Sequence, residues 1–319
     1  VLLTRADTPL ARAAAARAIP CVEAPWTLAL DPRALTSAVR AVARLRREPA
    51  APVLIHAHDS HALQLGIILA GWTGASLVAT RRSDTTPGRL WRQPRRVIAL
   101  SQSVVGRLMA AGVTPRRIVQ VPSAVDLAAL AALRRAPDGD PGPLLVAAGA
   151  LTPEKGHRTL IDALALLPPR LAAVRLVLVG TGPERAALES RIAAQGLAGR
   201  VELSGEIEEA MSCIAGATIL VQPSFREALG TAVLEAMALG VPVIASATGG
   251  LAELLADEHG VLVPPGDARA LAAALAALLE DPPRRARLAA RGLERVTGFD
   301  SMRVAAAVAG VYRSALTEP

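Results

Sequence analysis

Aromatic side chains and cysteines are scarce in this sequence of 319 residues, which has 2% aromatic residues and two cysteines. Single-stranded nucleic acids are bound largely by stacking of their bases on aromatic rings, so we expect no nucleic-acid partner. Cys21 and Cys213 lie far apart and belong to no CxxC pair. Neither a disulfide framework nor a zinc site is therefore expected, and a cytoplasmic location is favoured.

Lysine is rarer still, because Lys155 is the single lysine among 35 lysine and arginine residues. Arginine dominance of this degree is a general bias of the chain. The one position that keeps lysine is therefore a candidate functional residue.

A continuous hydrophobic span is also missing. The longest uncharged run, 62–80, contains several glycines and polar residues, so it predicts a helix, a turn and a strand instead of a membrane span. The first residues, Val1-Leu-Leu-Thr, predict a strand that leads to a helix near Pro9. Arg5 and Asp7 follow the strand at once, which argues against a cleavable signal.

Charge is unevenly distributed along the chain. Residues 1–136 carry 19 arginines and 7 acidic residues, a net charge of +12, whereas the remainder carries 16 basic and 21 acidic residues, a net charge of −5. A basic half is typical of contact with an anionic membrane surface or an anionic substrate. We therefore expect an anionic membrane surface as a partner of the first half, at the inner membrane face.

Short β-branched runs alternate with helical patterns along the whole chain. The runs are Val53–His56, Ser76–Thr80, Arg96–Leu100, Arg117–Val121, Leu144–Ala148, Arg175–Val179, Ala217–Val221 and Val241–Ala245. Continuous apolar strands of this kind are buried on both faces by helices, as in parallel sheets. Apolar stripes at helical spacing, such as Leu271, Leu275 and Leu278, predict the covering helices. The fold class is therefore α/β.

A Pro/Gly/Asp-rich cluster near residue 140 lies where the charge balance changes sign. It divides the chain into a Rossmann-like domain at 1–136, a linker at 137–143 and a second Rossmann-like domain at 144–319. The last helix is expected to pack back on the first domain.

The segment SFREALGTAVLEAMALGVPVIAS places two glutamates, Glu227 and Glu235, in apolar surroundings. Helix signals run from about Gly230 to Leu239. A buried carboxylate needs hydrogen-bond donors, and ligand hydroxyls would provide them. The amides at the helix N-terminus suit phosphate oxygens. Together these features favour a nucleoside diphosphate sugar, although solvated charges on an ordinary amphipathic helix remain an alternative.

The same segment, with Gly249-Gly-Leu-Ala-Glu253, closely resembles the E-x7-E signature of retaining family-4 glycosyltransferases, which have the GT-B fold of two Rossmann-like domains across a cleft. Further matches are Gly149-Ala-Leu-Thr-Pro-Glu-Lys-Gly156, Val179-Gly-Thr-Gly-Pro183 and Gly260-Val-Leu-Val-Pro-Pro-Gly-Asp267. The first half resembles the family more loosely.

The resemblance implies transfer of a sugar from a nucleotide diphosphate sugar to a saccharide or lipid-linked acceptor, in envelope polysaccharide or lipopolysaccharide synthesis. It implies no cofactor and no metal. The expected catalytic residues are Glu227, Lys155 and Arg82. The expected donor-binding residues are Glu235, Ala228, Leu229, Gly230, Thr231, Gly149, Gly180 and Gly182.

Three departures from the family pattern matter. Ala150 stands where an arginine is usual, so less diphosphate charge is compensated from this loop. Arg81-Arg82 stands where a histidine is common, and this pair could hold an anionic acceptor or the leaving phosphate. Family members also begin with one further strand and a Gly-rich loop, which do not precede Val1, so the first domain is expected to be truncated at its N-terminus.

Three other interpretations of the sequence are less consistent with its residues. His56, His58, Asp59 and His61 resemble the ligands of a metal-dependent hydrolase, but Ser60 interrupts the usual pattern. A dehydrogenase is disfavoured because Arg185 replaces the third glycine of the fingerprint that begins at Gly180. Asp138-Gly-Asp140 resembles a metal-binding DxD motif but lies in the linker. A non-catalytic nucleotide-sugar-binding protein remains the main alternative.

Overall fold

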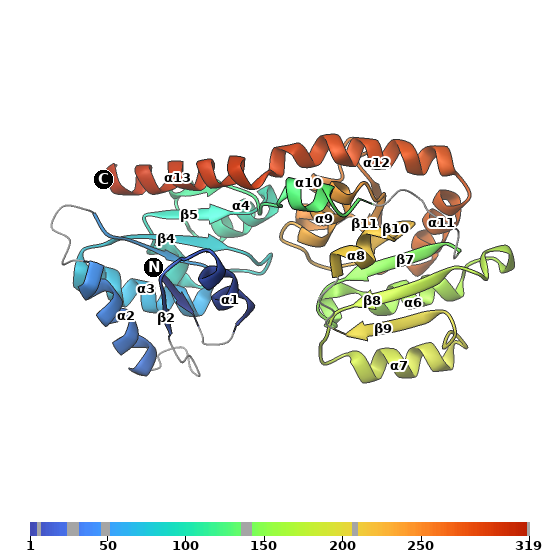
Figure 1. Ribbon diagram of the computed structural model, residues 1–319, viewed down its shortest axis with the longest axis horizontal. Helices are drawn as coiled ribbons and strands as arrows, with labels where there is room; N and C mark the ends of the chain where they lie inside the picture. Colours follow the sequence, from blue (N-terminus) through green and yellow to red (C-terminus); the bar gives the residue numbers. More distant parts are fainter. Residues whose placement is uncertain (5–7, 24–31, 46–51, 135–141, 206–209, 318–319) are drawn as a thin grey trace. The chain divides into compact units, whose positions relative to one another are not determined.

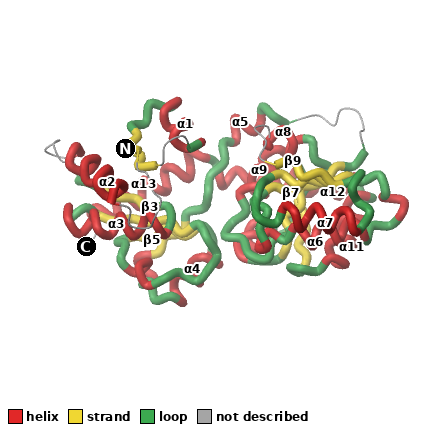
Figure 2. The backbone as a smooth tube through the Cα atoms, turned by 90° about the horizontal axis from the view of Figure 1, so that it is seen from below, coloured by secondary structure: helices red, strands yellow, loops and turns green. Residues whose placement is uncertain are grey.

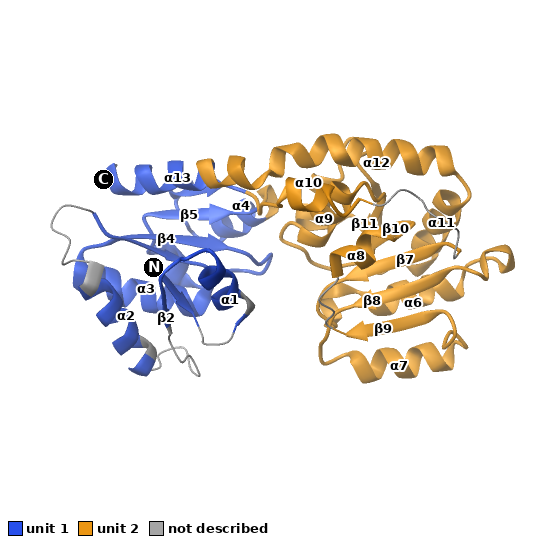
Figure 3. Ribbon diagram, in the orientation of Figure 1, with its two compact units in different colours: residues 1–100, 104–121, 307–319 blue, residues 101–103, 122–306 orange. Residues whose placement is uncertain are grey.

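The predicted strands form parallel sheets in two units of the computed structural model, which describes all residues except 5–7, 24–31, 46–51, 135–141, 206–209 and 318–319 (Figure 1). Unit 1 comprises residues 1–100, 104–121 and 307–319, and unit 2 comprises residues 101–103 and 122–306 (Figure 3). The linker expected at 137–143 lies outside the described residues, except for Gly142 and Pro143. Helix α13, Ser301–Thr317, begins in unit 2 and continues in unit 1.

In the described part of unit 1, four parallel strands form a sheet in the order β3, β4, β5, β6. Their bounds are Leu54–Ala57, Ser76–Arg81, Arg96–Ala99 and Ile118–Gln120. A separate parallel pair consists of β1, Leu2–Thr4, and β2, Cys21–Glu23. The helices are α1 Pro9–Ala16, α2 Pro32–Leu45, α3 Ser60–Thr73 and α4 Gln102–Ala110, with short 3₁₀ turns η1 Arg89–Arg92 and η2 Pro115–Arg117.

Unit 2 contains, among its described residues, a six-stranded parallel sheet in the order β12, β11, β10, β7, β8, β9. The strands are β7 Leu144–Ala148, β8 Arg175–Val179, β9 Val201–Gly205, β10 Ile219–Gln222, β11 Val243–Ser246 and β12 Val261–Val263. The helices are α5 Leu127–Ala131, α6 His157–Ala165, α7 Arg185–Ala194, α8 Ala210–Ala215, α9 Thr231–Leu239, α10 Gly249–Leu254, α11 Ala268–Leu279 and α12 Pro282–Val296. Three 3₁₀ turns, η3 Pro153–Lys155, η4 Pro169–Leu171 and η5 Thr297–Phe299, complete the unit.

The strand order of unit 2 reverses direction between β7 and β10. Strands β7, β8 and β9 extend to one side, and β10, β11 and β12 extend to the other. In open α/β sheets, ligands bind beyond the carboxyl ends of the strands at such a switch point. A ligand site is therefore expected at the loops that follow β7 and β10.

Alternating strand residues bury both faces of this sheet. Leu145, Leu176 and Ile219 belong to one core cluster, together with leucines of α6, α7 and α11. Side chains of the intervening residues, such as Val146 and Leu220, are also fully buried. Helices therefore cover the sheet in layers, as the tube drawing shows (Figure 2).

The α/β prediction with parallel sheets is confirmed. All nine predicted strands, including the one expected at Val1-Leu-Leu-Thr, are present, with bounds that differ by at most two residues. The strand expected from Val241 begins at Val243, because Pro242 has no N–H to donate to the ladder. The uncharged run 62–80 is α3, a left-handed turn at Gly74 and β4. Among the described residues, no helix is long and apolar enough to cross a membrane.

Candidate functional site

The loops that follow β7 and β10 are held against each other by a glycine. Gly156 has φ +69°, and a Cβ atom at this position would lie 2.0 Å from the carbonyl oxygen of Pro223. The backbone N–H of Phe225 donates a hydrogen bond of 2.8 Å to the carbonyl oxygen of Glu154. Only a residue without a side chain allows this approach, and it places the two loops side by side at the switch point.

The approach brings together two predicted catalytic residues. Lys155 Nζ lies 2.6 Å from Glu227 Oε2, and the two side chains are 23% and 15% exposed. The lysine side chain also passes over Gly149, because a Cβ atom there would lie 3.7 Å from Lys155 Cε. An ammonium group has three N–H donors, so one bond to Glu227 leaves donors for a second, anionic partner.

The predicted donor-binding glycines bring the loops after β7 and β8 together. Leu151 N donates to Thr181 O at 2.8 Å, which ties the two loops by their backbones. A Cβ atom at Gly180 would lie 2.0 Å from the carbonyl oxygen of Gly149, and one at Gly182 would lie 2.4 Å from that of Leu151. These glycines therefore permit close backbone packing beneath Lys155.

Helix α9 begins at the end of the loop that follows β10, and no side chain caps its N-terminus. Its N-cap, Gly230, has φ +100°, and no side chain bonds to the first amides. Predicted site residues Ala228 and Leu229 are 5% exposed, so they fix the loop by burial, whereas Thr231 is exposed. An uncapped helix N-terminus presents N–H groups and a partial positive charge to an anion.

Gly250 is a site residue to which the sequence analysis assigned no role. A Cβ atom there would lie 2.3 Å from the carbonyl oxygen of Ala228, and its N–H donates a bond of 3.0 Å to the carbonyl oxygen of Glu227. The glycine pair at 249–250 was the signal that could have identified it, because paired glycines often mark a close backbone approach.

Glu235 lies in the second turn of α9 and is half-buried. Burial raises the pKa of this carboxyl from 4.5 to about 7. In the described part of the chain, no hydrogen bond or ion pair is made by its side chain. A carboxyl group of this kind is ready to accept hydrogen bonds from a ligand.

In unit 1, Arg81 ends β4 and Arg82 follows it, and the two side chains differ in their surroundings. Arg81 is 6% exposed, donates to Thr85 Oγ1 at 2.6 Å, and has its guanidinium 5.0 Å from the ring centre of Trp91. The expectation that both arginines present their charge to a ligand is therefore wrong for Arg81. Arg82 is exposed, and its Nη2 lies 3.2 Å from Nδ1 of His58.

The HxHDxH segment does not form a metal site. His56 bonds through Nδ1 to the Tyr312 hydroxyl and through Nε2 to Thr80 Oγ1, each at 2.7 Å. Burial lowers the pKa of His56 to about 3. The Asp59 carboxylate accepts the N–H of His61 and caps α3. Within the residues that the structure describes, no three His, Cys, Asp or Glu side chains are arranged to hold a metal ion.

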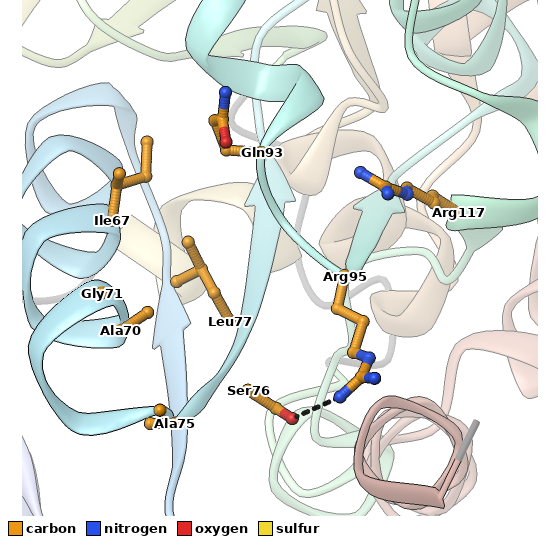
Figure 4. Close-up of a pocket in the computed structure, with 10 residues that line it drawn as sticks. Ile67, Ala70, Gly71, Ala75, Ser76, Leu77, Gln93, Arg95 and Arg117 are labelled. Atoms are coloured by element: carbon orange, nitrogen blue, oxygen red, sulfur yellow. Dashed lines mark hydrogen bonds between the residues drawn. The ribbon is translucent and has the colours of Figure 1, made fainter. Parts of the chain in front are cut away.

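A pocket of about 410 Å³ in unit 1 lies at the amino ends of the strands of its four-stranded sheet (Figure 4). Leu77, Arg95 and Arg117 line it, near the amino ends of β4, β5 and β6. Ligands of parallel sheets bind at the carboxyl ends, so this pocket is separate from the predicted reaction site.

Two family models match the chain, one in each half. The model described as "Glycosyltransferase Family 4" matches residues 1–129, and the model described as "Glycosyl transferases group 1" matches residues 134–295. The second match contains Lys155, Glu227 and Glu235.

Individual proteins agree with the family models. A phosphatidyl-myo-inositol mannosyltransferase of Mycolicibacterium smegmatis is 31% identical over 279 residues, which is 82% of this chain and 71% of that protein. The lipopolysaccharide core biosynthesis glycosyltransferase LpsE of Rhizobium meliloti is 35% identical over 49% of this chain and 45% of its own length.

Among solved structures, Anabaena HepE in complex with UDP has a TM-score of 0.83 at 24% identity, over 98% of this chain and 91% of that one. This likeness establishes the fold. Both halves of the chain, its relatives and its fold lead to one conclusion, that the chain belongs to the family-4, group 1 glycosyltransferases with the GT-B fold.

Proposed function

We propose that this glycosyltransferase moves a sugar, with retention of its anomeric configuration, from a nucleoside diphosphate sugar to an acceptor hydroxyl. The observation that carries the proposal is the contact of Lys155 Nζ with Glu227 Oε2 at 2.6 Å, in the loops beside the uncapped α9. Positive charge, amide donors and a carboxylate then lie at one switch point. These groups match the diphosphate and the hydroxyls of such a donor.

Diphosphate charge is compensated in this proposal by Lys155 and by the amides at the start of α9. Two N–H donors of Lys155 remain beyond the one that meets Glu227. Ala150 adds no charge where the family pattern usually has an arginine, so Lys155 is the sole side-chain cation of this loop that we assign to the donor. The amides of Gly230 and Thr231 add preorganised dipoles, and no metal ion is assigned a role.

The two glutamates take the hydroxyl groups on either side of the diphosphate. Glu235 lies about 7 Å along the helix axis from Gly230, since each helical residue rises about 1.5 Å. We assign the ribose hydroxyls to Glu235 and the sugar hydroxyls to Glu227. Solved relatives bound to UDP or to UDP-glucose support a donor of this class.

Transfer is assigned to attack from the front face of the sugar. The acceptor oxygen forms a bond to C1 while the bond from C1 to the phosphate oxygen breaks, and the leaving phosphate takes the acceptor proton. Lys155 and the α9 amides stabilise the charge that develops on that phosphate. Arg82, steadied by His58, is assigned to an anionic acceptor or to the leaving phosphate. A glycosyl group trapped covalently on Glu227 would refute front-face attack.

The acceptor is assigned to envelope glycan or glycolipid synthesis at the inner face of the membrane. Relatives named for phosphatidyl-myo-inositol mannosylation and for lipopolysaccharide core synthesis support this assignment. The net charge of +12 on residues 1–136 supports contact with anionic lipid.

Replacing the lysine tests the donor site. Lys155→Ala should weaken binding of the preferred nucleoside diphosphate about 10- to 100-fold, because a charge-assisted hydrogen bond contributes about 1.5–3 kcal/mol. Thermal shift with UDP, GDP and ADP would identify the nucleotide, and calorimetry would measure its affinity. The control Arg175→Ala removes one exposed charge at the amino end of β8. Equal affinities of the two variants would contradict the assignment.

The raised pKa of Glu235 predicts that nucleotide binding is linked to a proton. In the free protein its carboxyl is about half protonated at pH 7. Accepting ribose hydroxyls favours the carboxylate, so binding should release about half a proton at pH 7, and affinity should rise from pH 6 to pH 8. Calorimetry in buffers of different ionisation enthalpy measures the release. Glu235→Gln should abolish it, and an unchanged release in this variant would exclude Glu235 as the group that titrates.

Membrane contact is tested with lipid vesicles. Co-sedimentation with phosphatidylglycerol vesicles should exceed that with phosphatidylcholine vesicles and should fall as salt is raised, because each cation near the surface contributes about 1 kcal/mol. Indifference to both lipid charge and salt would eliminate the anionic-membrane assignment.

A further inference from the structure

A pocket of about 390 Å³ in unit 2 is lined by residues of the edge strand β12 and of helix α12. Small-molecule sites have volumes of about 300–1,000 Å³, so the pocket is large enough for a ligand. Leu262 and Leu288 form apolar parts of its wall. Neither Lys155 nor either glutamate of the donor site lines it, so it is a separate feature.

The pocket is positive, although it lies in the acidic half of the chain. Three arginines of α12, at positions 284, 287 and 291, and one acid, Glu258, line it. Spacings of three and four residues place the arginines on one face of the helix. Arg291 is balanced, since its Nη1 lies 2.9 Å from Glu258 Oε2 and its Nη2 donates to Asp257 O at 2.5 Å.

The charges of Arg284 and Arg287 are not balanced by an acidic side chain in this way. Other arginines of α12 have structural contacts: Arg285 donates to the carbonyl oxygens that end α11, and Arg295 lies over the ring of Phe299. Among the described residues, Arg284 and Arg287 form no ion pair and no side-chain hydrogen bond. Like charges three residues apart repel each other, and an oxyanion between them would remove that repulsion.

We propose that this pocket binds a phosphate group, carried by a phosphate ester or a diphosphate, at a site separate from the donor site. The guanidinium groups of Arg284 and Arg287 present paired donors that match phosphate oxygens. The N-terminus of α12 is already capped by the Asp281 carboxylate, so the two guanidinium groups, and not the helix dipole, would hold the anion. The apolar wall at Leu262 and Leu288 receives the uncharged part of the ester.

Calorimetry with pyrophosphate as the probe, at constant ionic strength, tests the site, and any pyrophosphate binding that Lys155→Ala removes is assigned to the donor site and set aside. The double variant Arg284→Ala/Arg287→Ala should bind pyrophosphate at least about tenfold more weakly than the native chain. Both positions are exposed and alanine favours helix, so circular dichroism should be unchanged. The control Arg269→Ala/Arg303→Ala removes the same charge from exposed positions of unit 2 outside the pocket and should retain native affinity.

An equal loss in both double variants, no loss in either, or no binding of pyrophosphate by the native chain would overturn the proposal. A second pair of probes identifies the source of the phosphate. Loss of glycerol 3-phosphate binding in the pocket variant supports a free ester, and loss of binding to phosphatidic acid vesicles alone supports a lipid headgroup. Retention of both by the pocket variant also overturns the proposal. None of these measurements depends on sugar transfer, so they test the pocket independently of the proposed enzyme activity.

Discussion

Contact between two backbone loops at the switch point of unit 2 is the constraint on which the site depends. Gly156 allows the carbonyl of Pro223 to approach to a distance that any side chain would block. The loop after β7 thereby places the only lysine of the chain beside the loop after β10, and the ion pair with Glu227 follows. Gly250 holds the other side of the second loop, so the start of α9 is fixed from both directions. Because backbone contacts hold these groups in place, little reorganisation is needed when charge arrives on a leaving phosphate.

Glu235 makes the protein less stable than it would be with a neutral side chain. Its pKa is about 7 in the folded chain and 4.5 at its ordinary value, so the unfolded chain loses this proton first as pH rises. Stability therefore declines between about pH 4.5 and 7, by at most roughly 3 kcal/mol and by less for a partly exposed group. A half-buried acid at such a cost is typical of a site where binding, not folding, has determined the residue.

Much of this arrangement could be read from the sequence, because backbone chemistry leaves strong local patterns. The apolar runs gave the central strands, and Gly240 followed by Pro242 marked the end of α9. The strands β2, β9 and β12 were not predicted, since β9 alternates apolar with polar residues and β2 and β12 contain apolar runs of at most three residues. The contact of Lys155 with Glu227 joins loops 72 residues apart and could only be inferred from the family resemblance. The inward turn of Arg81 depends on Trp91 and Thr85, which no local pattern links to it.

The central claim is that the diphosphate of the donor binds beside Lys155 and the start of α9. A crystal structure of the protein with its preferred nucleoside diphosphate measures this directly. Phosphate oxygens should lie within about 3 Å of Lys155 Nζ and of the Thr231 amide, with a ribose hydroxyl on the Glu235 carboxylate. A nucleotide bound elsewhere, with Lys155 and Glu227 still paired and out of contact with its phosphates, would contradict the account.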